Sequence, residues 1–319
     1  MEKKLWEPSE AQIKSSNMYR FMQFINQRHQ MDFDAYNSLY QWSIDNVTDF
    51  WAAMWEFADI RASHPFDQVV DDATKMPGAK WFSGAKLNFA ENLLRYRDDR
   101  EALVFNGEGQ VKKTVTYAEL YDEVERLAHS LRKMGVVAGD RVVGFIPNMP
   151  QAVFAMLAAT SIGAVWSSCS PDFGIKGVLD RFGQIKPKVL FTADGYFFKG
   201  KKIDSLGRIG DILKQLPSIE KVVVVSYTEN KPDIAQIPNG VYYEDFKPSG
   251  TPQALVFEQL PFDHPLYIMY SSGTTGLPKC MVQSTGGILI HHIKELMLHT
   301  NLTRDDTIFY FTTCGWMMW

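Results

Sequence analysis

The feature that most constrains the fold is a regular alternation of short apolar runs and helical patterns between residues 102 and 226. Residues 102–105 and 111–117 flank the turn sequence Asn-Gly-Glu-Gly and predict a β-hairpin. Further strands are expected at 141–146, 164–168, 188–192 and 221–226, and helices at 116–134, 150–162, 175–185 and 205–216. This spacing is typical of parallel βαβ units, so we expect an α/β fold with helices on both faces of the sheet.

The first helix of this series has clear signals at both ends. Thr116 is expected to be its N-cap, and Glu119 lies three residues later, as in a capping box. Gly135 follows the last turn and is expected to end the helix.

Composition excludes several classes of protein. The 319 residues are 45% apolar and carry a formal net charge of −4, which predicts a large core and gives no basic excess for nucleic acid or an anionic membrane. Cys169, Cys280 and Cys314 are too scattered for a disulfide framework or a thiolate zinc site. The longest apolar run, 153–166, is too short to span a bilayer. We therefore expect a cytosolic protein.

The first 95 residues differ from the rest in their aromatic content. Five of the eight tryptophans lie there, at positions 6, 42, 51, 55 and 81. Apolar residues at helical spacing between Tyr36 and Phe57 predict amphipathic helices. We expect an aromatic-rich, mainly helical module over residues 1–95 and a second domain over 96–319. The aromatics are expected to serve packing, and an aromatic face that binds a ligand is the alternative.

The final third of the chain is predicted in outline. Residues 227–264 are expected to be a surface connection, followed by a strand at 265–270, a loop at 271–279, a helix at 287–299 and a strand at 308–312. A Cys-Gly-Trp turn follows that strand, and no helix remains to cover it. We expect the chain to be part of a longer protein.

The stretch from Tyr270 to Lys279 reads Tyr-Ser-Ser-Gly-Thr-Thr-Gly-Leu-Pro-Lys and carries the chemistry. Hydroxyl groups, free backbone N–H groups and two glycines suit a polyphosphate, whose oxygens need many donors at short range. Lys279 adds a mobile positive charge. The spacing is not that of a Walker A loop. On composition alone, a Ser/Thr/Gly-rich surface turn is an equally good interpretation.

The complete string resembles the signature loop of the adenylate-forming superfamily, which includes acyl-CoA ligases, peptide synthetase adenylation domains and luciferases. In that superfamily the loop surrounds the β- and γ-phosphates of ATP. The resemblance implies nucleotide contacts from Ser271, Ser272, Gly273, Thr274, Thr275, Gly276 and Lys279.

Other strings extend the resemblance over nearly the whole chain. Residues 81–94 are similar to the N-terminal module of acetyl-CoA-synthetase-type enzymes, and Gly-Asp-Arg-Val at 139–142 with Pro-Asn at 147–148 resembles the next block of those ligases. Residues 166–174, 177–182 and 312–319 resemble the members of the superfamily that act on acetoacetate.

These similarities imply an ATP-dependent, AMP-forming ligation of acetoacetate to CoA through an acetoacetyl-AMP intermediate, with Mg²⁺ as co-substrate. Residues 1–95 would be the acetyl-CoA-synthetase-type module and 96–319 an incomplete AMP-dependent synthetase domain. Ligation of another short acid, such as acetate or propionate, is one alternative, and a non-catalytic nucleotide-binding module is another.

The resemblance also suggests further site residues. Trp316, Met317 and Met318 would line the acid or thiol pocket, with core packing as the alternative for each. Independently of the resemblance, Lys199 and Lys201 belong to a local basic cluster that would meet the phosphates of CoA, with a solvated loop as the favoured interpretation.

No residue of the chain is predicted to be the catalytic residue. The catalytic lysine and the magnesium ligands of the superfamily would lie beyond residue 319, so the chain alone is expected to be inactive. No metal site is expected, because His291, His292 and Glu295 do not have the spacing of a zinc motif.

Overall fold

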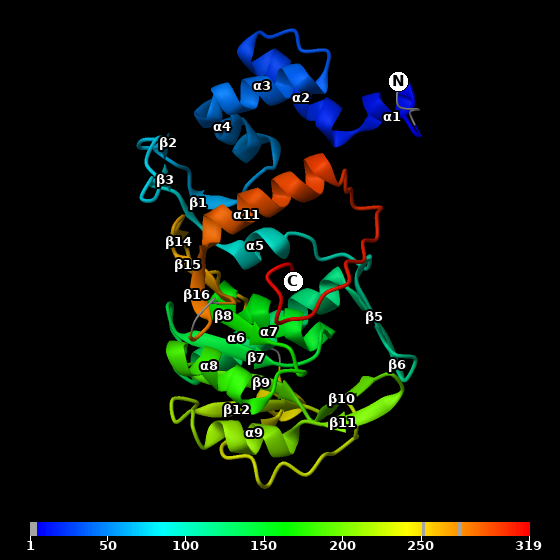
Figure 1. The fold of residues 1–319 in the computed structure, drawn as a ribbon, viewed down its shortest axis with the longest axis vertical. Coiled ribbons are helices and arrows are strands. Elements are labelled where there is room, and N and C mark those ends of the chain that lie inside the picture. The colour runs from blue at the N-terminus through cyan, green and yellow to red at the C-terminus, as the bar shows by residue number, and fades with distance from the viewer. Residues whose placement is uncertain (1–4, 251–252, 273–275) are drawn as a thin grey trace. The chain divides into compact units, whose positions relative to one another are not determined.

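A computed structural model describes residues 5–250, 253–272 and 276–319. The chain divides into two compact units (Figure 1). The first unit comprises Met1–Lys86, Pro261–Asp263 and Gly286–Tyr310, and the second comprises Leu87–Leu260, His264–Thr285 and Phe311–Trp319. Two short strands, β4 (Lys86–Leu87) and β14 (Leu260–Pro261), lie where the chain passes between the units.

A seven-stranded sheet forms the centre of the second unit, in the order β13-β12-β9-β7-β8-β15-β16. Its strands are β7 (Arg141–Phe145), β8 (Val165–Cys169), β9 (Val189–Ala193), β12 (Lys221–Val225), β13 (Gly240–Tyr242), β15 (Pro265–Ser271) and β16 (Lys279–Ser284). Neighbouring strands are parallel except β15 and β16, which pair antiparallel at one edge. The predicted α/β class is therefore confirmed.

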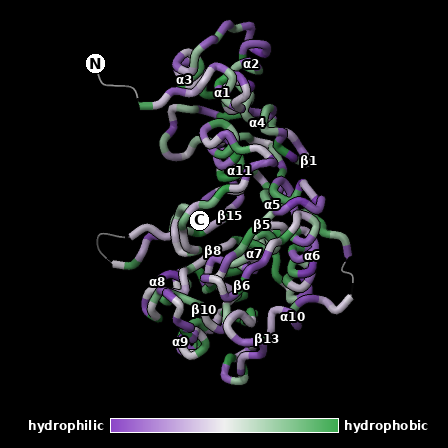
Figure 2. The backbone as a smooth tube through the Cα atoms, turned by 90° about the vertical axis from the view of Figure 1, so that its right-hand side faces the viewer, coloured by the Kyte–Doolittle hydropathy of each residue, from purple (hydrophilic) through white to green (hydrophobic). Residues whose placement is uncertain are grey.

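Helices cover this sheet. They are α5 (Phe89–Leu93), α6 (Tyr117–Lys133), α7 (Pro150–Ser161), α8 (Ile175–Ile185), α9 (Leu206–Leu213) and α10 (Tyr243–Phe246). The amphipathic ones, such as α6, α8 and α9, present an apolar stripe toward the core. Alternate strand residues such as Val143 and Phe145 share one buried cluster with Val178 of α8 and Ile209 of α9. Helix α7 is buried along almost its whole length, and Figure 2 shows it in the hydrophobic colour, whereas α6 has hydrophilic stretches.

Two hairpins complete the second unit. Strands β5 (Glu101–Gly107) and β6 (Val111–Thr116) form the predicted hairpin, and β10 (Gly195–Phe198) pairs with β11 (Lys201–Asp204). The capping box of α6 is present, with the Thr116 hydroxyl accepting from the Glu119 N–H at 3.1 Å and the Glu119 carboxylate accepting from the Thr116 N–H at 2.8 Å.

The first unit is mainly helical. Its elements are α1 (Glu10–Ser15), α2 (Asn17–His29), α3 (Tyr36–Asp45), α4 (Val47–Phe57), β1 (Ala62–His64), β2 (Gln68–Val70) and β3 (Trp81–Ser83). A late segment joins them, comprising α11 (Thr285–Lys294) from Gly286 onward and the π-helix η1 (Glu295–His299). Trp55 stacks on Phe82 at 4.9 Å between ring centroids, and Phe82 lies 4.7 Å from Phe262, so packing does account for several aromatics.

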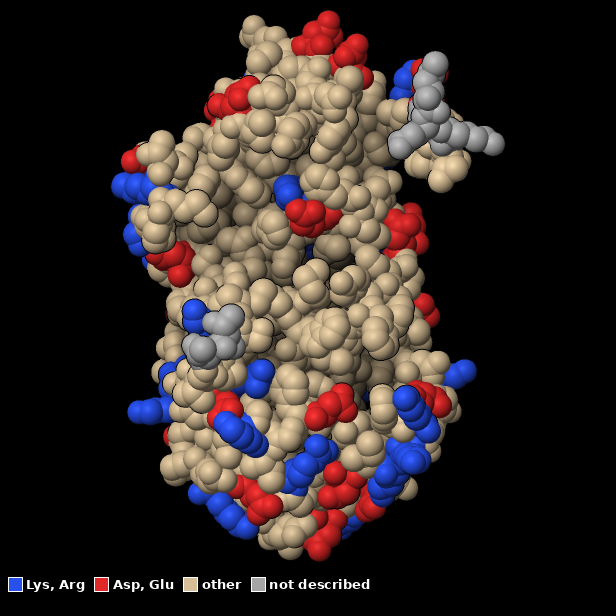
Figure 3. All heavy atoms as spheres, viewed as in Figure 1, with Lys and Arg blue, Asp and Glu red and all other residues tan. Residues whose placement is uncertain are grey.

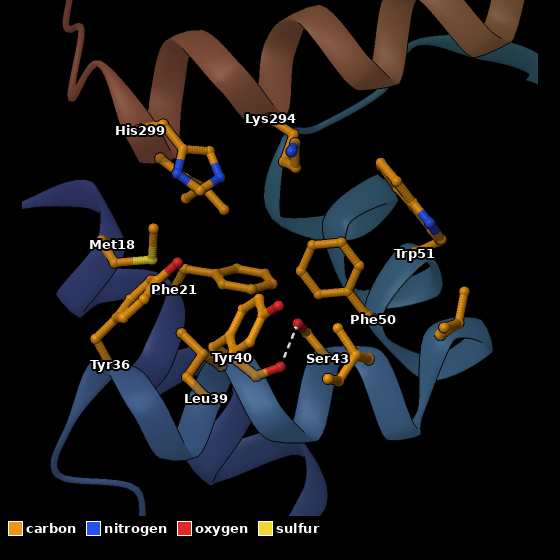
Figure 4. A pocket seen from close by; sticks show the side chains of 13 residues that line it. Met18, Phe21, Tyr36, Leu39, Tyr40, Ser43, Phe50, Trp51, Lys294 and His299 are labelled. Carbon is orange, nitrogen blue, oxygen red and sulfur yellow. Dashed lines mark hydrogen bonds between the residues drawn. The ribbon is translucent and has the colours of Figure 1, made fainter.

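Other aromatic side chains of the first unit line a cavity of about 350 Å³ (Figure 4). Phe21, Tyr36, Tyr40 and Phe50 point into it from α2, α3 and α4, and His299 lies across from them on η1. The aromatic content of this unit is therefore not used for close packing alone.

Two expectations for the second half of the chain were wrong, and one strand was missed. The connection at 227–264 contains β13, which pairs in parallel with β12 and extends the sheet. The loop at 271–279 is followed by a strand, β16, that the sequence analysis did not anticipate. Residues 308–312 form no strand, and Phe309 and Phe311 are exposed. The place beside β15 that such a strand could occupy is taken by β16.

Within the described part of the chain, no helix combines the length and the apolar character needed to cross a bilayer.

Candidate functional site

The string from Tyr270 to Lys279, the candidate phosphate loop, is the connection of an antiparallel hairpin at the edge of the sheet. Ser271 at the end of β15 pairs with Lys279 at the start of β16, and Tyr270 pairs with Cys280. The two ends of the loop are therefore held side by side by the strand register. Gly276 has a φ of +91°, a conformation that favours glycine.

The predicted nucleotide contacts fall in two groups. Ser271, Ser272, Gly276 and Lys279 lie in the described part of the hairpin, and of these Ser272, Gly276 and Lys279 are exposed and Ser271 is half-buried. Gly273, Thr274 and Thr275 lie outside the described residues. Nucleotide binding by either group stays a prediction.

Helix α8 supports the base of this loop through two side chains three residues apart. The Gln184 amide donates to the Pro278 carbonyl at 2.9 Å. The Arg181 guanidinium lies over the Tyr270 ring, 5.6 Å from its centroid. Residues three apart on a helix share a face, so one face of α8 contacts both ends of the loop.

The end of β15 is also attached to β8. The Ser167 hydroxyl lies 2.7 Å from the Ile268 carbonyl oxygen and 3.2 Å from the Tyr270 hydroxyl. Burial raises the pKa of the Tyr270 phenol well above its usual range. Tyr270 therefore stays neutral at physiological pH and serves as a structural base for the loop.

A second part of the site is the turn at 314–319, which lies against the carboxyl ends of the parallel strands. The Ser168 hydroxyl of β8 donates to the Cys314 carbonyl at 2.6 Å, and the Trp319 indole donates to the Asn148 side chain at 2.9 Å. A Cβ atom added to Gly315 would lie 2.8 Å from the Ser170 nitrogen, so only glycine fits without a shift. In open α/β sheets this edge is where ligands bind.

The three predicted pocket residues of this turn are exposed at its surface. Trp316, Met317 and Met318 are 57%, 49% and 64% exposed in this structure. Figure 3 shows few charged side chains in the middle of this face, whereas charged side chains gather around α9 and the β10–β11 hairpin. A role in holding the acid or the thiol stays a prediction.

The two cysteines near this edge are poor candidates for nucleophiles. Burial raises the pKa of the Cys169 thiol to about 12, and burial also raises the pKa of the Cys314 thiol well above its usual range. A thiol must ionise to attack, so thiolate chemistry at these positions is disfavoured.

The lysines proposed for CoA lie at the tip of the β10–β11 hairpin. Lys199 has a φ of +51°, and its N–H and that of Gly200 donate to the Glu108 carboxylate at 3.0 and 2.8 Å. The Lys199 and Lys201 side chains are exposed. Lys202, beside them, is ion-paired with Glu229. The carboxylate of Glu108 thus fixes the turn, and the lysine heads remain at the surface.

The donor set of the loop fits phosphate oxygens better than a metal ion held by protein. Residues 271–279 contain hydroxyls, backbone N–H groups and one lysine, and no Asp or Glu. Magnesium prefers carboxylate and phosphate oxygens, so it would reach this loop bound to the nucleotide. The described residues form no group of three or more potential metal ligands, and His291 lies 4.0 Å from Glu295.

Sequence reasoning missed Arg181, Gln184 and Gly315 as members of the site. It also missed Phe173, whose ring centroid lies 4.5 Å from the Arg181 guanidinium carbon and whose ring edge lies 3.3 Å from a Cβ atom built on Gly315. A signal existed for two of them, because Arg181 and Gln184 are polar positions three apart on a helix that was predicted correctly. Their contacts depend on strand order, which brings α8 under the hairpin.

Comparisons with known proteins agree with this geometry. Residues 89–319 match the family described as "AMP-binding enzyme", and residues 36–93 match "Acetyl-coenzyme A synthetase N-terminus". The chain is 48% identical to acetoacetyl-CoA synthetase of Macaca fascicularis, over 99% of this chain and 48% of that protein. It is 44% identical to acetoacetyl-coenzyme A synthetase of Rhizobium meliloti (strain 1021), over 100% of this chain and 49% of that protein.

A solved structure supports the same relationship. Acetoacetyl-CoA synthetase from Streptomyces lividans superposes with a TM-score of 0.93 at 43% identity, covering 99% of this chain and 49% of that one. The chain spans about half the length of the relatives that it matches. With a family match over residues 89–319, the chain belongs to the AMP-binding enzyme family.

Proposed function

We propose that this protein ligates acetoacetate to CoA in an ATP-dependent, AMP-forming reaction with Mg²⁺ as co-substrate. The observation that carries the proposal is the hairpin connection that joins Ser271 to Lys279 at the edge of the sheet. Its donors and its single lysine suit the leaving pyrophosphate of an activated acid. Relatives that match almost the whole chain are acetoacetyl-CoA synthetases, which supports acetoacetate as the acid.

In the first half-reaction the acid carboxylate attacks the α-phosphorus of ATP, forming acetoacetyl-AMP and releasing pyrophosphate. The physical difficulty is to bring an anion close to a polyanion. The loop would offset charge on the β- and γ-phosphates in two ways. Ser271, Ser272 and Gly276 would donate hydrogen bonds from hydroxyl and N–H groups, and Lys279 would supply a positive charge. Magnesium bound to the nucleotide would neutralise further charge.

In the second half-reaction the CoA thiol attacks the acyl carbon of the adenylate, and AMP leaves. We place the acid and the thiol beside Trp316, Met317 and Met318, whose exposed apolar side chains can exclude water from a reactive mixed anhydride. Lys199 and Lys201 are proposed to meet the CoA phosphates, because their heads are exposed at a turn that is itself fixed by Glu108.

The organisation proposed from the sequence is a helical module over 1–95 and an AMP-dependent synthetase domain over 96–319. A location in the cytosol is proposed because Cys169, Cys280 and Cys314 are free thiols, as expected in a reducing compartment.

The test uses the whole gene product, whatever its length, in an assay of acid-dependent exchange between pyrophosphate and ATP. A panel of acetoacetate, acetate, propionate and butyrate is followed through exchange and then through thioester formation with CoA. We expect the highest kcat/KM with acetoacetate. Exchange that is fastest with another acid would overturn the substrate, and no exchange with any acid would overturn the ligase.

A further inference from the structure

Arg181 of α8 lies between two aromatic rings that belong to different parts of the candidate site. Its guanidinium carbon is 4.5 Å from the Phe173 ring centroid and 5.6 Å from the Tyr270 centroid. Its Nη1 atom donates to the Gly177 carbonyl at 2.8 Å, one turn earlier on the helix. This hydrogen bond fixes the planar group in one orientation.

The first ring, that of Tyr270, is directly connected to the phosphate loop. Tyr270 immediately precedes Ser271, and its pairing with Cys280 ties it to the strand that begins at Lys279. Tyr270 is therefore part of the strand pairing that fixes both ends of the loop.

The Phe173 side leads to the turn at 314–319. A Cβ atom added to Gly315 would lie 3.3 Å from the edge of the Phe173 ring, so the turn rests directly on this ring. The turn carries Trp316, Met317 and Met318, which the proposed function assigns to the acid and the thiol.

Arginine suits this position better than lysine. A guanidinium is planar and can stack on aromatic faces while it donates a hydrogen bond, whereas an ammonium is a compact and strongly hydrated point charge. A cation–π contact contributes modestly at an exposed site and more strongly when the cation is desolvated.

We propose that Arg181 is a positioning residue that holds the phosphate loop and the 314–319 turn in register for adenylate formation. It acts through Tyr270 on one side and through Phe173 on the other, without touching substrate. This inference rests on the proposed function and adds a specific residue to it.

The test is steady-state kinetics of adenylation by the whole gene product carrying Arg181→Gln. We expect the KM for ATP and the KM for the acid to rise together, each about three- to tenfold, which corresponds to the loss of one such contact. The KM for CoA, measured with preformed acyl-adenylate, should stay within twofold. Arg181→Lys should give an intermediate effect, because it keeps the charge but not the planar stack.

Two further variants test separately the support of the phosphate loop and the support of the 314–319 turn. Gln184→Leu removes the hydrogen bond to Pro278 and should raise mainly the KM for ATP. Phe173→Leu should raise mainly the KM for the acid, because it removes the ring under Gly315. Lys176→Gln is the matched control, since Lys176 is an exposed residue of the same helix that pairs with Asp180, and no change is expected.

The outcomes distinguish this inference from the proposed function. If Arg181→Gln lowers only the amount of active protein, with both KM values unchanged, the positioning role is overturned while the ligase stands. A rise in the KM for ATP alone would also overturn it, because that result indicates direct contact with the nucleotide. If the unaltered protein forms no adenylate, the proposed function itself has failed.

Discussion

The two parts of the candidate site are held in place in different ways. The ends of the phosphate loop are fixed by main-chain pairing between β15 and β16, which continues for several residues below the loop. The 314–319 turn has no strand partner and is held by two side-chain hydrogen bonds and by the close approach of Gly315 to Ser170. The loop base therefore depends on register, whereas the turn depends on a few individual side chains.

The difference in anchoring fits the functions proposed for the two parts. A loop that must meet a polyanion gains from rigid anchoring, because preorganised donors need no rearrangement during the reaction. A turn that is proposed to line the acid side can vary its exposed residues without disturbing the sheet. We expect substitutions in the turn to change substrate affinity and those in the loop to change the chemical step.

The largest effect is expected from Lys279→Ala. Loss of the single cation of the loop should lower the rate of adenylation by about 10²–10³, a magnitude typical for one group that stabilises transition-state charge. Thioester formation from preformed acyl-adenylate should change much less. Both half-reactions are measured separately, with Lys214→Ala, at the C-cap of α9, as a charge-matched control. Equal losses in the two half-reactions would remove the assigned role.

A smaller effect, on affinity, is expected from Gly315→Ala. The new methyl group would meet the Ser170 nitrogen at 2.8 Å, so the turn must shift. We expect the KM for the acid to rise about tenfold, equivalent to about 1.4 kcal/mol, with the KM for ATP nearly unchanged. Gly210→Ala on α9 is the control, because a Cβ atom there meets nothing within 4 Å. An unchanged KM for the acid would show that the turn does not face that substrate.

Thiol labelling distinguishes the two parts without mutation. Cys280 is exposed beside Lys279, whereas Cys169 and Cys314 are buried. Iodoacetamide should therefore modify Cys280 first, and saturating Mg-ATP should slow that reaction several-fold if phosphates occupy the neighbouring loop. Peptide mass spectrometry identifies the modified residue. Rapid labelling of Cys314 in the folded protein would show instead that the turn opens readily.

The smallest effect is expected from Trp319→Phe, which removes the hydrogen bond to Asn148 and keeps most of the ring. A single neutral hydrogen bond contributes about 0.5–1.5 kcal/mol. We expect an increase of a few-fold in the KM for the acid and no change in pyrophosphate exchange at saturating acid. Asn148→Ala should give the same shift, and the double variant should add little to either single change.

Much of the fold was predictable because its signals are local. The bounds of α6 were predictable from the capping box of Thr116 and Glu119 and from the glycine after the helix. Helix α8, between Ile175 and Ile185, was predictable from its periodic apolar residues. Strand β16 was missed because it is an edge strand of exposed and half-buried residues, and its only apolar run is the short stretch Cys280–Val282. The apolar run at 308–312 suggested a strand that does not form, since pairing depends on neighbours that are distant in sequence.

The site was predictable only in part, because some of its contacts join residues that are distant in sequence. The loop could be recognised because its donors are consecutive in sequence. The contacts of Arg181 with Phe173 and Tyr270 join residues up to about ninety positions apart, and they follow from the order in which β8, β15 and β16 assemble. No local pattern carries that information.

The most direct test of the central claim is a crystal structure of the whole gene product with Mg²⁺ and a non-hydrolysable ATP analogue. The account predicts that the β- and γ-phosphates accept hydrogen bonds from the connection between Ser271 and Lys279. Phosphates bound at another place on the molecule, with this hairpin free of contacts to them, would contradict it.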